Sequence, residues 1–210
     1  MTVFSVKVDI SQVVGLADKL DGLTAEEIGA ATVKVINETT DSVYDLARTR
    51  MLSSVNLTDN YIQRKMKVTP ATTGKPEAII TAFGQRGDMT GLSHYGAMQE
   101  SVGVGNSKRS RGDPKRGIAK GQKAAGISVE VTQGKRALLP HAFTMPGIKD
   151  NSGNLVVFTR NQAGKIRSRT GPSVYQLFRA AAILIEPDAE QQLRDSLIEM
   201  AEKAFEKALS

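Results

Sequence analysis

The chain has 210 residues, of which 40% are hydrophobic and 24% are charged, values typical of a globular protein rather than a disordered one. It contains no cysteine, which excludes disulfides, thiol catalysis and thiolate metal sites. The net charge is +6, but residues 106–123 alone carry seven Lys or Arg and one Asp, so the remainder is nearly neutral and the basicity is local.

The N-terminal part predicts a strand and then helices. Residues 3–10 alternate, with Phe4, Val6 and Val8 on one face, as expected for a strand with one buried side. A short helix is expected from Ser11 to Gly22. A capping box at residues 24–27 then opens a long helix that runs to about residue 53. Its inner face is predicted to carry five apolar residues: Ile28, Ala31, Val35, Val43 and Leu46.

The rest of the chain predicts mainly strands and ends in helices. A short basic helix follows residues 57–59 and includes Tyr61–Lys65. Strands are expected at 66–69, 77–83, 127–132, 136–145 and 155–160. Residues 84–126 are punctuated by glycine and show no sustained period, so they predict a long flexible insertion. A basic turn at 161–171 precedes a short helix through Phe178, and a separate amphipathic helix is expected from Pro187 to Leu209.

Together these elements predict an α+β fold: an antiparallel sheet, a long N-terminal helix packed across it, and a C-terminal helix. No internal repeat or composition change marks a domain boundary, so one domain over residues 1–210 is expected. The N-terminus lacks the apolar run of a signal peptide, and no stretch has the 18 or so apolar residues that span a bilayer. A soluble protein is expected.

No pattern of residues predicts catalysis, a metal site or a cofactor. His94 and His141 lie in different segments without a patterned carboxylate nearby, so neither indicates a metal site or a nucleophile–base pair. No phosphate-binding loop, zinc-protease motif or nucleophile elbow occurs. The sequence therefore predicts a protein that is not an enzyme.

The basic segment 106–123 is the candidate contact site, and its sequence leaves three interpretations open. It could be a solvated loop, an assembly loop that becomes ordered against an acidic protein surface, or an arm that binds nucleic acid. It contains no aromatic residue that could stack on a base. The candidate interface residues are Lys108, Arg109, Arg111, Lys115, Arg116, Lys120 and Lys123.

A second motif lies nearer the C-terminus. It comprises Val156–Arg160, the basic turn that ends at Lys165–Arg167, Gly171-Pro172-Ser173-Val174, and Leu177-Phe178. This segment resembles the C-terminal signature of the lambda-type minor tail protein Z family of tailed bacteriophages, and the order of the elements extends the resemblance over about residues 24–209.

A folding role explains the five motif residues Gly171, Pro172, Ser173, Val174 and Phe178. The glycine permits a turn, the proline fixes φ at a helix start, and the serine can cap the helix. The two apolar side chains then hold the helix against the sheet.

The resemblance implies a structural virion protein that acts in tail completion at the head-proximal end of the tail, with assembly in the host cytoplasm. It further implies a ring, expected to be a hexamer, with contacts to tail terminator, tail tube or head–tail connector proteins. It implies no cofactor and no membrane. The alternative is a nucleic-acid-binding protein that uses residues 106–123 as an arm, and a weak DNA contact through this segment also stays open.

Overall fold

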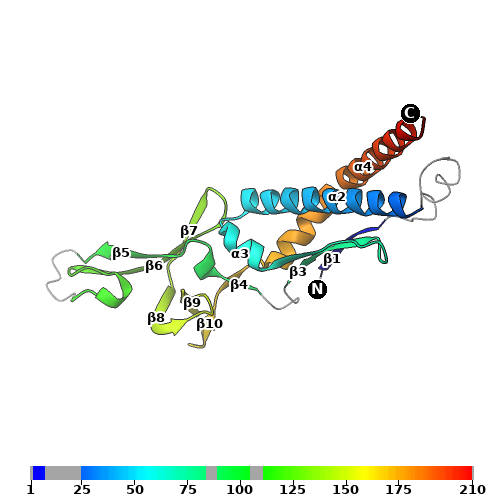
Figure 1. Ribbon diagram of the computed structural model, residues 1–210. Coiled ribbons are helices and arrows are strands. Elements are labelled where there is room, and N and C mark those ends of the chain that lie inside the picture. The colour runs from blue at the N-terminus through cyan, green and yellow to red at the C-terminus, as the bar shows by residue number, and fades with distance from the viewer. Residues whose placement is uncertain (1, 8–24, 84–88, 105–110, 210) are drawn as a thin grey trace. The chain divides into compact units, whose positions relative to one another are not determined.

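A computed structural model of the protein describes residues 2–7, 25–83, 89–104 and 111–209, and it describes side chains for residues 26–83, 89–104 and 111–203 (Figure 1). The chain folds as two compact units. Unit 1 contains residues 1–50, 63–85 and 174–210, and unit 2 contains residues 51–62 and 86–173. The prediction of a single domain over residues 1–210 stays a prediction.

Unit 1 is built on a three-stranded antiparallel sheet with the order β1-β3-β2. Its strands are β1 (Thr2–Lys7), β2 (Met66–Thr69) and β3 (Glu77–Ala82). The central strand β3 alternates buried and partly buried residues, with Ala78, Ile80 and Ala82 completely buried. This period of two gives the sheet one apolar face, which the helices of unit 1 cover.

Two long helices supply most of the core of unit 1 (Figure 1): α2 (Ala25–Ser54) and α4 (Val174–Leu209). Ile36 of α2 packs with Ala71 and Ala78 beside the sheet, and Leu193 of α4 lies against the same cluster. Asn37 fixes α2 to the β2–β3 connection because its side chain both donates to the carbonyl of Ala71, at 3.2 Å, and accepts from its N–H, at 2.7 Å. Helix α3 (Asp59–Arg64) follows α2 along the chain.

Unit 2 contains three small antiparallel sheets, with orders β5-β6-β7, β10-β9-β8 and β11-β4. The elements of unit 2 are β4 (Thr90–Gly91), η1 (Leu92–His94), β5 (Met98–Gly103), η2 (Pro114–Arg116), β6 (Gln122–Thr132), β7 (Lys135–Leu139), β8 (Ala142–Lys149), β9 (Leu155–Arg160), β10 (Ile166–Ser168) and β11 (Thr170–Gly171).

Tyr95 is the largest fully buried side chain of the described part of unit 2. Its hydroxyl donates a hydrogen bond to the carbonyl of Pro172, and its backbone N–H donates one to the carbonyl of Leu92. Gly171 lies against the aromatic ring, so closely that a Cβ there would be 2.7 Å from Cε2. The tyrosine therefore joins the start of β5 to the segment that leads into α4. Burial raises the pKa of its hydroxyl.

The α+β prediction is confirmed, and several boundaries agree with it. The long helix and the strands at 66–69 and 155–160 occur where they were expected. The predicted position of Leu46 on the inner face of α2 is wrong, because Leu46 is 42% exposed while Ala47 is buried. The buried face continues from Val43 through Ala47 to Met51, four residues at a time, which leaves Leu46 beside it. The short helix expected at 11–22 lies outside the described residues.

Three other predictions are wrong. The strand expected at 136–145 is two strands, β7 and β8, separated by a turn at Pro140 and His141. The two C-terminal helices form one helix, α4, with Pro187 inside it. Proline removes a backbone hydrogen bond but does not end this helix, whose buried face continues on both sides through Ile185 and Ala189.

The long insertion expected at 84–126 is also corrected. Its described residues contain β4, η1, β5, η2 and the first part of β6, whereas 84–88 and 105–110 lie outside the described residues. The glycines hid the strand pattern in the sequence. Five glycines between residues 96 and 126 have positive φ and lie at turns or at a bulge. They do not prevent the neighbouring residues from forming strands. Regular pairing of β5 with β6 replaces the expected loop.

Candidate assembly surface

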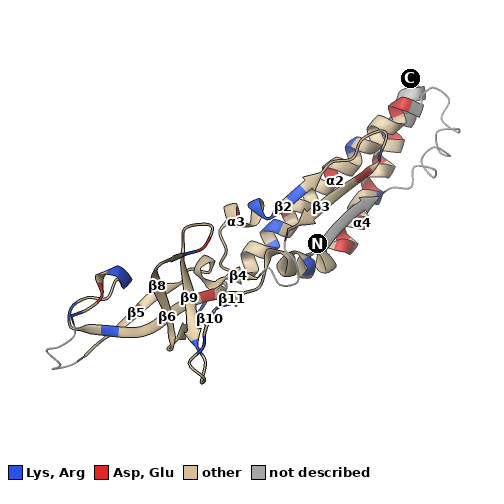
Figure 2. Cartoon of the chain, turned by 90° about the horizontal axis from the view of Figure 1, so that it is seen from below, with Lys and Arg blue, Asp and Glu red and all other residues tan. Residues whose placement is uncertain are grey.

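The predicted basic interface residues lie on the connection between β5 and β6 and at the start of β6. Lys108 and Arg109 are outside the described residues. The side chains of Arg111, Lys115, Lys120 and Lys123 are exposed, whereas Arg116 is half-buried and pairs with Asp113 at 3.2 Å. Figure 2 shows Lys and Arg gathered at the end of the β5–β6 pair. The described basic residues therefore lie near one another, but Arg116 is already paired with Asp113.

The described part of this connection forms a closed turn rather than an open loop. The backbones of Asp113 and Ile118 exchange two hydrogen bonds, of 2.8 and 2.9 Å, and η2 lies between them. Ile118 is only 5% exposed, so the turn is anchored by an apolar side chain. Lys115 and Arg116 are consequently held by the fold of unit 2 and need no partner to order them.

The outer face of the β5-β6-β7 sheet carries exposed apolar side chains on both of its edge strands. Met98 of β5 is 58% exposed and Leu138 of β7 is 51% exposed. The strand register pairs both with Ser128 of β6, so the three residues form one row across the sheet. Val102, on β5, is exposed as well. Edge strands and exposed apolar patches of this kind mark surfaces that contact other chains.

A polar network fixes the centre of this face. The hydroxyl of Ser128 donates to Glu100 at 2.6 Å and accepts from Arg136 at 3.0 Å. Arg136 also donates to the carbonyl of Gly96 and lies 3.6 Å from Glu130. The carboxylates of Glu100 and Glu130 both interact with partners inside this network. The face therefore has a polar centre between its apolar edges.

These residues were missed in the sequence because β5 was read as part of an irregular insertion. The signal that could have found them is the alternation Met98, Glu100, Val102, which sits opposite Ile127 and its neighbours once β5 pairs with β6. Leu138 was placed inside one long strand, so its position on an edge could not be predicted.

A second polar cluster ties the β8–β9 turn to η1. Asp150 accepts from the Ser93 hydroxyl at 2.9 Å and lies 3.1 Å from His94 Nε2. It also accepts from the N–H groups of Ser152 and Asn154, each at 2.9 Å. The Tyr61 ring covers His94 with 4.2 Å between ring centroids. Serine and histidine both contact the carboxylate, and this differs from a nucleophile–base–carboxylate chain.

The cluster lowers the pKa of Asp150. Burial alone would raise the pKa of the Asp150 carboxyl. Four groups lower this pKa, and their combined effect is larger than that of burial: the N–H of Asn154, the Ser93 hydroxyl, the N–H of Ser152 and the charge of His94. The pKa of Asp150 therefore lies below its ordinary value. A carboxyl whose pKa is lower in the folded state than in the unfolded state stabilises the fold at pH values above the unfolded-state pKa, which is about 3.9 for Asp. This stabilisation is lost as the pH falls from there through the folded-state pKa.

We therefore expect the melting temperature of unit 2 to fall as the pH decreases below about 4, and to fall less steeply in Asp150→Asn. The measurement is thermal unfolding at several pH values, with hydrogen exchange of the β8 and β9 amides as the local reading. Asp188→Asn is the control, because this exposed α4 carboxylate lies in unit 1. Identical pH profiles for the wild type and Asp150→Asn would contradict the expectation.

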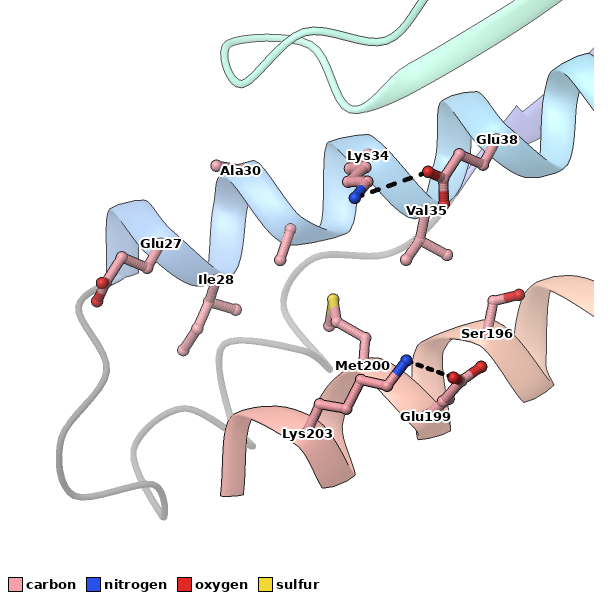
Figure 3. A pocket seen from close by; sticks show the side chains of 11 residues that line it. Glu27, Ile28, Ala30, Lys34, Val35, Glu38, Ser196, Glu199, Met200 and Lys203 are labelled. Atoms are coloured by element: carbon pink, nitrogen blue, oxygen red, sulfur yellow. Dashed lines mark hydrogen bonds and ion pairs between the residues drawn. The ribbon is translucent and has the colours of Figure 1, made fainter. Parts of the chain in front are cut away.

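Unit 1 has an open groove of about 570 Å³ between α2 and α4 (Figure 3). Ile28, Val35 and Met200 give it an apolar lining. Two ion pairs flank the lining, Lys34–Glu38 at 3.8 Å and Lys203–Glu199 at 2.5 Å. The lining also includes Glu27 and Ser196.

The five motif residues near the C-terminus lie at the junction of the last short strand and α4. Gly171, Ser173, Val174 and Phe178 are buried, and Pro172 is half-buried. Helix α4 begins at Val174, one or two residues after the predicted start at Pro172 or Ser173. The side-chain cap expected from Ser173 stays a prediction. Burial of these residues is consistent with a role in folding.

Within the described ranges, no three His, Cys, Asp or Glu side chains come together in a way that could hold a metal ion. Across the same part of the chain, no helix is both long and apolar enough to cross a membrane. His141 is exposed in the β7–β8 turn.

Comparison with known proteins identifies one family. The sequence model of prophage minor tail protein Z matches residues 15–208, which is nearly the whole chain and includes both units. Neither the curated proteins nor the solved structures contain a match.

Proposed function

The chain belongs to the prophage minor tail protein Z family, and from this premise we propose that it acts in tail completion, at the head-proximal end of the tail. The family is one of structural phage tail proteins, so the chain is a structural protein of the virion tail. In the proposed role, copies of the chain form a ring, and the ring contacts tail tube, terminator or head–tail connector proteins before the head joins.

The observation that carries the proposal is the outer face of the β5-β6-β7 sheet. Met98 and Leu138 are large, apolar and more than half exposed, and each lies on an edge strand whose backbone can pair with another chain. A ring needs two different patches on each subunit that meet head to tail. The β5 edge and the β7 edge are two such patches on one sheet.

The test is substitution of the two apolar residues in the intact chain and in the phage that encodes it. Met98→Glu with Leu138→Glu is expected to abolish concentration-dependent association in sedimentation experiments, and to leave mainly separate heads and tails in electron micrographs. Met98→Leu with Leu138→Met is the matched control, because it keeps both side chains apolar and close to their original size. A strictly monomeric wild-type chain across the micromolar range, with no binding to tail tube or terminator proteins, would refute the proposal.

A second candidate function is direct contact with DNA through the β5–β6 connection. The observation in its favour is that Arg111, Lys115, Lys120 and Lys123 are all exposed. Binding to phosphates would weaken steeply as salt increases. We rank this function below assembly because the described part of the connection has no aromatic side chain on which a base could stack.

A further inference from the structure

The two units differ in charge. Unit 1 carries 13 Lys or Arg and 16 Asp or Glu, whereas unit 2 carries 15 Lys or Arg and 6 Asp or Glu. Residues 106–123 account for only part of this excess. No Asp or Glu occurs between Asp150 and Glu186, a stretch that contains the whole β9–β10 hairpin. The hairpin is therefore a second centre of positive charge in unit 2, and Figure 2 shows Lys and Arg at its end.

Three cations of the hairpin lie on one face of its second strand. The backbone ladder extends beyond β10 at both ends. Before β10, the N–H of Asn161 donates to the carbonyl of Lys165 at 3.0 Å, and after it the N–H of Arg169 donates to the carbonyl of Val157 at 2.8 Å. Alternate residues of a strand project to the same face, about 6.6 Å apart. Lys165, Arg167 and Arg169 therefore form a row, here called the basic row, and all three are exposed.

The basic row is not neutralised within the part of the chain that the structure describes. None of its three side chains forms an ion pair with a described residue. Arg169 is held in place, because its Nε donates to the Thr159 hydroxyl at 2.7 Å. This bond uses one N–H of the guanidinium and leaves the donors of the two terminal nitrogens for an anion. The row therefore presents aligned positive charge, one member of which is already ordered.

Protection of a sheet edge does not explain the basic row. Strand β10 is an edge strand of the β10-β9-β8 sheet, and charged side chains keep such edges from pairing with other chains. Charges of either sign and on either face serve that purpose. The β5 and β7 edges of the same unit carry exposed Met98 and Leu138 instead. Three like charges in one row repel one another, and an anionic partner would relieve this repulsion.

The spacing and the surroundings of the row indicate the kind of partner. A phosphodiester backbone carries evenly spaced negative charges, and contacts with phosphates need no aromatic side chain. Arginine also binds phosphate through two parallel N–H groups. An acidic protein surface fits less well, because the centre of a protein interface is apolar and depleted of charge. The neighbour of Arg167 on β9 is the hydroxyl residue Thr159.

We propose that the basic row binds the phosphate backbone of a nucleic acid, with a phosphate at each of its three cations. This site differs from the β5–β6 connection, to which the second candidate function assigns a DNA contact. It reads no base sequence, because contacts with phosphates position a protein without specifying the bases. The inference goes beyond the role in tail completion and does not depend on the formation of a ring.

The experiment measures binding of the full-length chain to a fluorescent DNA duplex, by anisotropy, at salt concentrations from about 50 to about 200 mM. Lys165→Gln with Arg167→Gln removes two phosphate contacts. The slope of log K against log salt is therefore expected to become shallower by about 1.8, at about 0.9 for each contact. Each single substitution is expected to change the slope by about half as much.

Lys149→Gln with Arg160→Gln is the matched control. It removes one Lys and one Arg, both exposed on the same β10-β9-β8 sheet. Lys149 lies on β8, and Arg160 pairs with Ile166, so both are outside the basic row. The control is expected to keep the wild-type slope. Arg167→Lys keeps the charge of the row and is expected to keep this slope too.

Four outcomes would overturn the inference. They are a wild-type slope in the row variant, equal changes in the row variant and the control, no binding of the wild-type chain at the lowest salt, and tighter binding of polyglutamate than of the duplex. An oligothymidylate is titrated as well, and a change of slope with either form of DNA supports the inference. Both variants keep the β5–β6 connection intact, so its contribution cancels in the comparison. The titration measures no assembly, so its failure is distinct from failure of the assembly experiment.

Discussion

Gly126→Ala is expected to destabilise unit 2 more than any other single methyl group added to the β5-β6-β7 sheet. Gly126 has φ +128°, a conformation that residues with a side chain rarely adopt. A Cβ at this position would be 2.3 Å from the backbone oxygen of Leu139 and 2.8 Å from Cα of Pro140. Backbone atoms of β7 and its turn cannot move aside as a flexible side chain can.

The expected cost has two parts. A strained φ costs about 1–3 kcal/mol, and overpacking costs about the same again. The sum, about 2–6 kcal/mol, is a large fraction of the stability of an ordinary domain. The carbonyl of Gly126 also accepts from Gln99, so the substitution should disturb this hydrogen bond as well.

The measurement is urea unfolding together with hydrogen exchange of the β6 and β7 amides, which report on unit 2 alone. Gly103→Ala is the control, because Gly103 lies on β5 with ordinary φ and no atom within 4 Å of an added Cβ. The control is expected to change stability by less than about 1 kcal/mol. Equal effects of the two substitutions would show that the close approach of β6 and β7 is not a feature of the folded protein.

Regular local patterns explain which elements could be predicted from the sequence. Strand β9 is bounded by the turn at Asp150–Gly153, and β3 alternates through Ala78, Ile80 and Ala82, so both were found. Helix α2 was found because its buried face repeats every three or four residues over its whole length. These signals lie within one segment and need no knowledge of its neighbours.

Elements that depend on distant neighbours could not be predicted in the same way. The alternation within β5 is short, and the strand is completed by its pairing with β6, which contains a bulge between Glu100 and Ser101. Pro187 is a strong local signal for a helix boundary, yet α4 continues through it. Burial of Ile185 and Ala189 on the two sides of the proline stabilises one helix where two were expected.

The candidate site was predicted in part. Charge alone located Lys115 and Arg116, but it could not show that Arg116 pairs with Asp113, because the closed turn brings these two residues together. Gln99 carried no signal at all. Its side chain donates to the carbonyls of Glu100 and Gly126, whose positions follow from strand pairing rather than from composition.

Phe178→Ala is expected to have an equally large effect on unit 1. Phe178 is 1% exposed and lies on the buried face of α4, which Val174, Ala181 and Ile185 continue at helical spacing. Replacing a buried phenylalanine by alanine costs about 3–5 kcal/mol, because transfer energy is lost and a cavity is left. The residue belongs to the motif through which the sequence resembles its family, so a structural role for that motif predicts this loss.

Ile183→Ala provides the matched comparison, since Ile183 is on the same helix but 63% exposed. It should change the free energy of unfolding by about 0.5 kcal/mol or less. Hydrogen exchange of the α4 and α2 amides, with urea unfolding of the whole chain, separates the two cases. If both variants unfolded alike while tail assembly failed only in Phe178→Ala, the phenylalanine would act in contacts with other proteins instead of in the core. The motif would then be an interaction site, and its residues would have to become exposed when the chain joins the tail.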